Sequence, residues 1–245
     1  MTAAVRIEER EDRVIAQLDR PEARNAIDQS MVDDLHALCA SLESNPKTLL
    51  LCGGEGFFAA GADIAQLRER RRSDALKGIN SSVFDRIRHL PMPSIALLDG
   101  FAIGGGAELA YACDFRLGST RTRIGNPEPG LGILAAAGAT WRLKELVGEA
   151  VAKEILLAGR MLTADEALDV HLLSEVVEPE HLLEAGHRWA DRIAGQVPLA
   201  VRLTKAVFHA PAEAHPFIDD LAQAVLFETE EKYERMTAFL ERKKR

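Results

Sequence analysis

The sequence predicts an α/β fold, in which a core of alternating strands and helices is followed by a purely helical extension. Short apolar runs alternate with amphipathic stretches up to about residue 178. One of these runs, at residues 47–52, is continuously apolar and is followed by a helical pattern, which is typical of parallel sheets. Beyond residue 178 only helical periodicity remains. We therefore divide the chain into a core at residues 1–185 and a helical region at residues 186–245.

The first elements follow from turn signals and periodicity. Strands at residues 5–8 and 13–19 flank a short polar turn and should pair with each other. Asp28 is a suitable N-cap for a helix that ends near Ser44, since apolar residues recur through it at helical spacing. The strand at residues 47–52 follows this helix.

Two turns rich in small residues come next. Residues 57–64 open a helix with alanines and one glycine, and residues 93–114 join an apolar strand to an apolar helix through Gly104, Gly105 and Gly106. Glu108 lies in the first turns of this helix. Glycine lets the backbone approach a ligand, and the free N–H groups at a helix start favour negative charge. Both turns could therefore stabilise an oxyanion; the alternative is that the glycines serve only close packing of helix on strand.

Three other segments have distinctive sequence patterns: an amphipathic stretch, a basic run and a turn that contains prolines. An amphipathic helix is predicted at residues 73–90, ending before a proline. The basic run at residues 68–72 is either a solvated helix face or a contact for a ligand phosphate. In the turn at residues 123–132 two prolines flank Glu128 and aim its carboxylate, although a plain surface turn has the same residue types.

The second half of the core is mainly helical. A strand at residues 114–117 precedes helices at 136–146 and 149–157, and residues 163–166 have the spacing of a capping box. Residues 173–178 form a last strand. The helices that we expect after it are at residues 179–193, 199–209, 212–227 and 229–242.

Composition excludes several classes of protein. The chain has 245 residues, 47% of them hydrophobic, and a net charge of −8, which argues against nucleic acid or an anionic membrane as partner. No signal peptide and no run of transmembrane length is seen, so we expect a cytoplasmic protein. Cys39, Cys52 and Cys113 are expected to be buried thiols, and no metal-ligand spacing occurs, so no metal site is predicted.

Four spaced segments resemble the crotonase superfamily, the enoyl-CoA hydratases and isomerases. They are residues 18–25, 58–64, 99–109 and 126–132. The resemblance implies a spiral of ββα turns in two sheets, with a core that binds a coenzyme A (CoA) thioester and a C-terminal helical region that forms trimers or dimers of trimers. It implies an acyl-CoA substrate and no cofactor apart from the CoA that the substrate carries.

The resemblance also assigns roles to residues. The thioester oxygen would lie between the backbone amides of Ala62 and Gly105. Glu108 would deprotonate water, and Glu128 would supply a proton to the α-carbon. The residues implied in substrate binding are Arg24, Ala60, Gly61, Ala62, Asp63, Ile64 and Gly105.

Because both glutamates are present, the sequence favours an enoyl-CoA hydratase of fatty-acid or aromatic-acid catabolism. The alternatives are an isomerase or C–C lyase of the same family, a non-catalytic CoA- or RNA-binding relative, and a serine hydrolase, for which no Gly-x-Ser-x-Gly motif exists. Two departures from the family leave acyl-chain preference and CoA coverage open. Residues 132–141 replace proline and glycines by Leu134 and alanines and end in Trp141, and the chain stops at residue 245.

Overall fold

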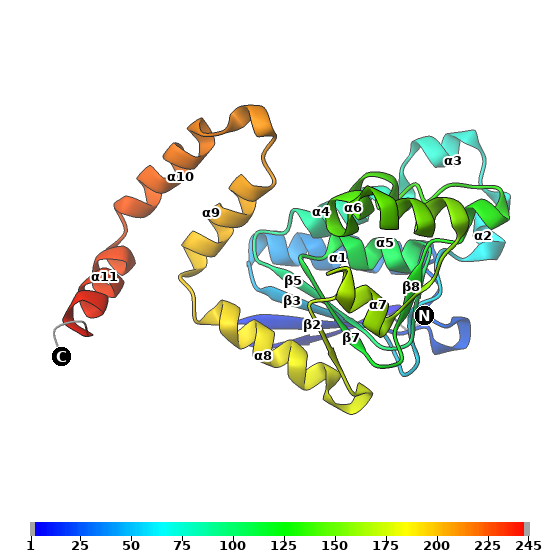
Figure 1. The fold of residues 1–245 in the computed structure, drawn as a ribbon, viewed down its shortest axis with the longest axis horizontal. Helices are drawn as coiled ribbons and strands as arrows, with labels where there is room; N and C mark the ends of the chain where they lie inside the picture. The colour runs from blue at the N-terminus through cyan, green and yellow to red at the C-terminus, as the bar shows by residue number, and fades with distance from the viewer. Residues whose placement is uncertain (1–2, 243–245) are drawn as a thin grey trace.

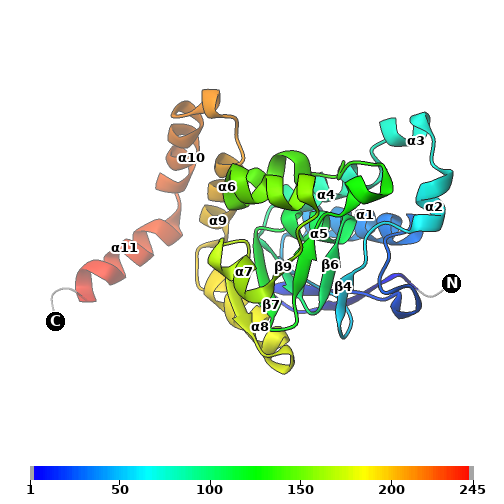
Figure 2. The same cartoon turned by 45° about the vertical axis from the view of Figure 1, so that its right-hand side comes forward.

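The computed structural model describes residues 3–242, whose strands form two sheets (Figures 1 and 2). The larger sheet has six strands within this range, and all but its first pair are parallel neighbours. Its strands, in spatial order, are β1 (Val5–Glu9), β2 (Arg13–Leu18), β3 (Thr48–Cys52), β5 (Ser94–Leu98), β7 (Phe115–Ser119) and β10 (Glu175–Val177). The smaller sheet contains β4 (Phe57–Ala59), β6 (Phe101–Ile103), β8 (Arg123–Gly125) and β9 (Leu162–Thr163).

The chain alternates between the two sheets. β3, β5 and β7 lie in the larger sheet, and each is followed directly by a strand of the smaller sheet, namely β4, β6 and β8. Helical segments return the chain from β4 and β6 to the larger sheet, whereas after β8 and α6 the chain adds β9 to the smaller sheet before it reaches β10. This repeated ββα unit is the spiral that the resemblance implies, so the predicted α/β fold class is confirmed.

Helices cover both faces of the larger sheet (Figure 1). One apolar cluster includes side chains of the sheet together with α1, α4 and α5, and a second joins the opposite side chains of the strands to α8. The helices of the core are α1 (Gln29–Ser44), α2 (Ile64–Glu69), α3 (Arg72–Leu76), α4 (Ile79–Arg88), α5 (Gly105–Ala112), α6 (Ala139–Ala158), α7 (Ala164–Asp169) and α8 (Leu182–Ala194). Every residue of α5 is buried, so the helix that carries Glu108 is the central one.

Several predicted elements differ in the structure. The turn predicted to open a helix at residues 57–64 begins as β4, and the helices predicted at residues 179–193 and 212–227 begin with 3₁₀ turns at residues 179–181 and 212–214. The single helix predicted at residues 73–90 is wrong, because Gly78 at φ 61° separates α3 from α4. The turn predicted at residues 123–132 begins as β8 and continues as a 3₁₀ turn, Glu128–Leu131. The Asp28 N-cap and the capping box of Thr163 and Glu166 are confirmed, since each side chain accepts the expected backbone N–H.

Beyond α8 the chain is helical and extends away from the core (Figures 1 and 2). The helices are α9 (Pro198–Phe208), α10 (Phe217–Phe227) and α11 (Glu230–Arg242). The predicted boundary between residues 185 and 186 falls inside α8, which packs on the larger sheet. The division into a core and a helical region stays a prediction. Residues 1–2 of the predicted core and 243–245 of the predicted helical region lie outside the described range.

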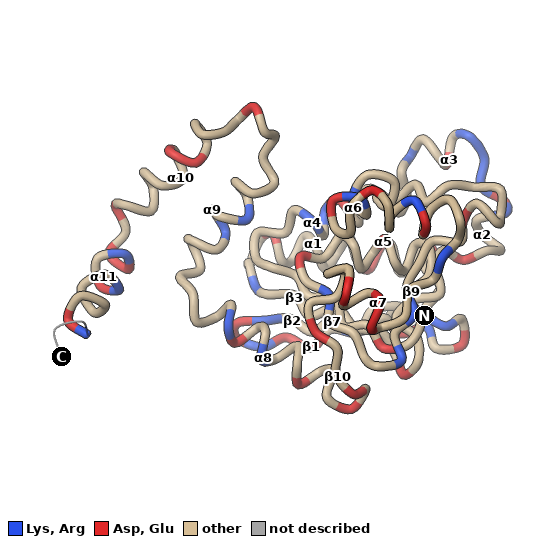
Figure 3. The backbone as a smooth tube through the Cα atoms, in the orientation of Figure 1, with Lys and Arg blue, Asp and Glu red and all other residues tan. Residues whose placement is uncertain are grey.

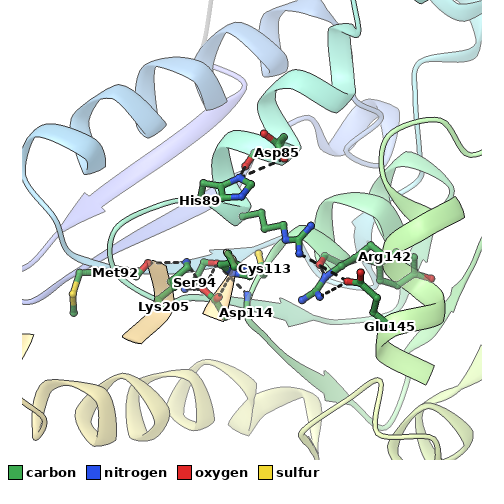
Figure 4. A network of polar contacts seen from close by, with 12 residues as sticks. Asp85, His89, Met92, Ser94, Cys113, Asp114, Arg142, Glu145 and Lys205 are labelled. Carbon is green, nitrogen blue, oxygen red and sulfur yellow. Dashed lines mark hydrogen bonds and ion pairs between the residues drawn. The ribbon is translucent and has the colours of Figure 1, made fainter. Parts of the chain in front are cut away.

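A buried ion pair fastens α9 to the core (Figure 4). The Nζ group of Lys205 lies 2.6 Å from Oδ2 of Asp114 and also donates a hydrogen bond to the carbonyl oxygen of Met92. The backbone N–H and hydroxyl of Ser94 donate to the same Asp114 oxygen. Because the Lys205 side chain is buried and that of Asp114 is only 18% exposed, the attachment point of the extension is specific.

Two kinds of feature are absent from residues 3–242. No helix there has both the length and the apolarity that crossing a bilayer requires. No three side chains of the types His, Cys, Asp and Glu gather there in a way that could hold a metal ion. The predicted cytoplasmic location and the predicted lack of cofactor stay predictions.

Candidate active site

The glycine turn before α5 brings backbone and helix into close contact. Gly104 has φ 54°, and its N–H donates to the carbonyl oxygen of Gly125, so strand β6 ends and the chain turns into the helix. A Cβ atom added to Gly106 would lie 2.2 Å from the carbonyl oxygen of Ala59. The packing role of the glycines is therefore real, and it places the start of α5 against the end of β4.

Two backbone amides become neighbours at this contact. A Cβ atom added to Gly105 would lie 3.4 Å from the amide nitrogen of Ala62, and one added to Gly61 would lie 3.8 Å from the nitrogen of Gly105. Within residues 3–242 neither the Ala62 N–H nor the Gly105 N–H donates a hydrogen bond. Gly61 itself has φ 104°, a conformation that suits glycine. The turn thus presents two adjacent donors without acceptors.

Glu108 is buried and held in one orientation. Its Oε1 atom accepts hydrogen bonds from the backbone N–H groups of Ala137, at 2.7 Å, and Ala139, at 3.1 Å. Burial raises the pKa of this carboxyl to about 7; the two amide bonds oppose the shift and the charge of Glu128 adds to it. Its Oε2 atom makes no hydrogen bond to any described residue, so one oxygen is left for a ligand.

Glu128 is fixed beside the same turn. Its Oε1 atom accepts a hydrogen bond from the Nδ2 group of Asn126 at 3.4 Å, and a Cβ atom on Gly104 would lie 2.9 Å from that oxygen. Its Oε2 atom is buried and has no partner among the described residues. Burial raises the pKa of Glu128 as well. An unpartnered buried oxygen favours the neutral acid over the carboxylate.

One cavity of about 540 Å³ joins these groups. Both carboxyl side chains and both amide-bearing residues line it, and apolar side chains around Leu134 complete its wall. Of the residues implied in substrate binding, those on the wall are Ala60, Gly61, Ala62, Ile64 and Gly105.

Asp63 and Arg24 are placed differently. The Asp63 side chain caps α2 by accepting the N–H of Gln66, and Arg24 lies with its guanidinium over the ring of Phe57 at 5.2 Å. Neither residue is on the wall of the 540 Å³ cavity.

The basic run at residues 68–72 reaches the cavity. Arg70, Arg71 and Arg72 are on its wall, and Figure 3 shows this cationic segment between α2 and α3. Arg68 instead pairs with Glu69 and is exposed. The run is thus partly a solvated surface and partly a positively charged rim, which suits an anionic ligand.

Sequence reasoning missed the groups that position the two carboxyls. Ala137 and Ala139 contribute only backbone N–H groups, and their sole signal is the run of small residues before α6. Asn126 accepts the hydroxyl of the buried Tyr111 at 3.0 Å, which fixes the amide that faces Glu128. The assembled site has two donors for a developing oxyanion and two acid/base groups on one cavity.

Comparison with known proteins agrees with this geometry. The sequence profile of the family described as "Enoyl-CoA hydratase/isomerase" matches residues 9–245. The short-chain-enoyl-CoA hydratase of Clostridium acetobutylicum is 36% identical, with 96% of this chain and 94% of that protein covered. The crotonyl-CoA hydratase of Syntrophomonas wolfei is also 36% identical, over 97% of this chain and 95% of its own length.

A solved structure, an enoyl-CoA hydratase subunit of Geobacillus kaustophilus, superposes with a TM-score of 0.91. It is 33% identical, and the alignment covers 98% of this chain and 95% of that one. With a family profile along nearly the whole chain and relatives of this identity and coverage, the protein belongs to the enoyl-CoA hydratase/isomerase family.

Proposed function

We propose that this enzyme is an enoyl-CoA hydratase, which adds water across the 2,3-double bond of a 2-enoyl-CoA to give a 3-hydroxyacyl-CoA. The observation that carries the proposal is the pair Glu108 and Glu128 on one cavity, beside the unused amides of Ala62 and Gly105. The names of the two hydratase relatives support the same reaction.

The two amides act on the thioester. Its carbonyl oxygen accepts hydrogen bonds from the N–H groups of Ala62 and Gly105, which draws electron density from the double bond and makes C3 electrophilic. The enolate that forms after attack at C3 places its negative charge on the same oxygen. Each donor of this kind contributes on the order of 3 kcal/mol to transition-state stabilisation.

The two glutamates move the protons. The free Oε2 atom of Glu108 accepts a proton from the water as its oxygen bonds to C3, while Oε1 stays anchored to Ala137 and Ala139. Glu128, whose unpartnered oxygen favours the protonated form, donates a proton to C2. The product gains a hydroxyl group at C3 and a hydrogen atom at C2. Transfer of one proton from Glu108 to Glu128, directly or through solvent, then restores both groups.

The CoA part of the substrate binds to the wall of the same 540 Å³ cavity. Main-chain atoms of residues 60–64 and Gly105 hold the pantetheine arm and adenine, and the arginines at residues 70–72 face the phosphates. Arg24 and Asp63 belong to the implied binding set, and a movement of their side chains would be needed for direct contact.

Crotonyl-CoA tests the proposal directly. The purified protein should remove the absorbance of the conjugated thioester, and the product should be 3-hydroxybutyryl-CoA by mass. Conversion of a 3-enoyl-CoA to a 2-enoyl-CoA without hydration would instead identify an isomerase. If no short, medium or aryl enoyl-CoA is hydrated, the hydratase assignment is wrong, and salt-sensitive RNA binding would then support the non-catalytic alternative.

The extension suits self-association. α9, α10 and α11 expose large apolar side chains along their length, and an apolar surface of this kind needs a partner. These side chains are Phe208, Phe217, Leu221, Val225, Phe227, Tyr233, Met236 and Leu240. We expect a homotrimer, or a dimer of trimers, by light scattering, and a monomeric protein at micromolar concentration would contradict this expectation.

A further inference from the structure

A second cavity, of about 410 Å³, adjoins the first at Glu108. It shares part of its wall with the first cavity, and the shared residues are Gly78, Ser81, Glu108, Ala136 and Ala137. If the proposed function holds, C3 of the acyl chain faces Glu108. The carbon atoms beyond C3 then point away from the thioester and into this second cavity, so its chemistry determines which acyl groups fit.

The wall of the second cavity carries two arginines. Arg88 comes from the end of α4 and Arg142 from α6, and both share the carboxylate of Glu145. Arg142 donates to its Oε2 atom at 3.0 Å (Figure 4), whereas the nearest nitrogen of Arg88 is 3.8 Å away. Two guanidinium groups therefore compete for one carboxylate, and Arg88 is the one left without a close partner.

Arg88 is also largely buried. Its side chain is 17% exposed, and its Nε–H finds no acceptor within residues 3–242. The guanidinium lies over the indole ring of Trp141, 4.5 Å from the ring centre. Burial, and then the charge of Arg142, lower the pKa of Arg88, because both disfavour the cation. Burying a guanidinium without a close anionic partner costs free energy. An anion that enters the neighbouring cavity and pairs with Arg88 offsets this cost.

The other charges around this cavity are already engaged or lie at its rim. Lys77 pairs with Asp74 at 2.9 Å, and the exposed Asp85 lies 3.4 Å from the ring of His89. Glu108 lies on the wall that the two cavities share, and the proposed reaction uses it there. The surplus positive charge is thus concentrated at Arg88 and Arg142, which present planar donors suited to a carboxylate.

We propose that the substrate's acyl chain ends in a carboxylate, which is held by Arg88 while Trp141 keeps the guanidinium plane in place. The substrate class is then the 2-enoyl-CoA thioesters of dicarboxylic acids. Trp141 and Arg88 act as specificity residues, and neither takes part in the water addition.

The experiment compares matched 2-enoyl-CoA pairs of equal carbon number, one ending in a carboxylate and one in a methyl group, from pentenoyl to octenoyl. In the wild type the kcat/KM ratio should favour the carboxylate at one or more lengths. Arg88→Gln should lower that ratio by about 10- to 100-fold. Arg88→Lys should retain part of it, because the charge remains without the planar fork.

Arg86→Gln is the matched control. Arg86 lies on the same helix but binds Glu43 at 2.7 Å on the side of α1, and it does not line the cavity. Its substitution should leave the ratio unchanged. A wild type that shows no preference for the carboxylate at any length overturns the proposal. So does an Arg88→Gln variant that loses activity equally on both members of a pair.

Binding of saturated analogues separates this inference from the hydratase assignment. Calorimetry with acyl-CoAs that end in a carboxylate or a methyl group measures the same preference without any reaction. Tighter binding of the carboxylate form, lost in Arg88→Gln, supports the inference even if no enoyl-CoA is hydrated. Hydration of crotonyl-CoA with no carboxylate preference in either assay leaves the hydratase assignment standing and overturns this inference.

Discussion

At the scale of single residues, Glu108 shows how the fold prepares a carboxyl group for proton transfer. The residue is only 4% exposed, and two backbone N–H groups hold one of its carboxyl oxygens. Burial disfavours the charge, and the amides limit that effect, so the pKa settles at about 7. A group with this pKa can both accept and release a proton near neutral pH.

Replacing either glutamate by glutamine tests the proton transfers. Glu108→Gln and Glu128→Gln should each lower kcat by roughly 10²- to 10⁴-fold with little change in KM, since the amide has a similar shape but cannot transfer the proton. Stopped assays with crotonyl-CoA measure both constants. Near-wild-type turnover in one variant would remove that residue from its proposed role.

The pKa of Glu108 also predicts how stability depends on pH. Because the folded-state pKa is raised above the ordinary value of 4.5, its contribution to stability is present below pH 4.5 and is lost as pH rises to about 7. Glu108→Gln removes this loss, and the amide oxygen can still accept the N–H groups of Ala137 and Ala139. At pH 8 the variant should be more stable than the wild type by up to about 3 kcal/mol.

Urea unfolding at pH 5 and pH 8 measures this effect. The stability difference between variant and wild type should appear at pH 8 and shrink at pH 5. Equal differences at both values would mean that the Glu108 carboxyl is not the titrating group. A more stable but inactive variant would show that the buried acid costs stability for the sake of function.

At the scale of elements, the contact between α5 and β4 positions both the amides and Glu108. Gly106 makes this contact possible, because a Cβ atom there would overlap the carbonyl oxygen of Ala59. Gly106→Ala should therefore reduce the free energy of unfolding by about 2 kcal/mol, despite the better helix propensity of alanine. Gly130→Ala is the control, since a Cβ atom there meets nothing within 4 Å and should change stability by less than about 0.5 kcal/mol. Equal stability of the two variants in denaturant unfolding would contradict the packing argument.

Sequence patterns were sufficient for elements whose signals are local. The Asp28 cap, the capping box at Thr163 and the alternation of apolar runs all depend on residues within a few positions of each other. The break at Gly78 was missed because amphipathic periodicity continues across it while the backbone turns to φ 61°. Sequence patterns also missed the strands of the smaller sheet, β4, β6, β8 and β9, because each is only two or three residues long and forms only by pairing with its neighbours.

The site was predictable where chemistry resides in side chains. Glu108 and Glu128 could be selected because glycines precede the first and prolines flank the second, so that the backbone fixes each carboxylate, and the resemblance gave them roles. Their supports could not be selected, because Ala137 and Ala139 lie about 30 residues from Glu108 in sequence and act through backbone N–H groups that every residue has. The Arg88–Trp141 contact likewise joins α4 to α6 and has no local signal.

At the scale of the whole molecule, the extension depends on a small attachment. α9, α10 and α11 project from the core (Figure 2), and the Lys205–Asp114 pair lies where α9 meets it. Burial by itself would raise the pKa of Asp114, but the neighbouring His209 ring and the charge of Lys205 hold it below its ordinary value. The stabilising contribution of this carboxylate is therefore full above pH 3.8 and is lost only as pH falls through the lowered pKa.

Lys205→Met tests whether that pair holds the extension in place. Methionine keeps the apolar stem but leaves Asp114 buried without its cation, which should cost about 3–5 kcal/mol. Because α9 loses its attachment, chymotrypsin should cleave at Phe208 and Phe217 faster than in the wild type. Adding Asp114→Asn should restore part of the stability, since no charge is then left unpaired.

Lys153→Met is the control. It breaks only the exposed pair with Glu149, so the variant should unfold and be cleaved like the wild type. If Lys205→Met and Lys153→Met were cleaved at equal rates, the buried pair would not be what fastens α9 to the core.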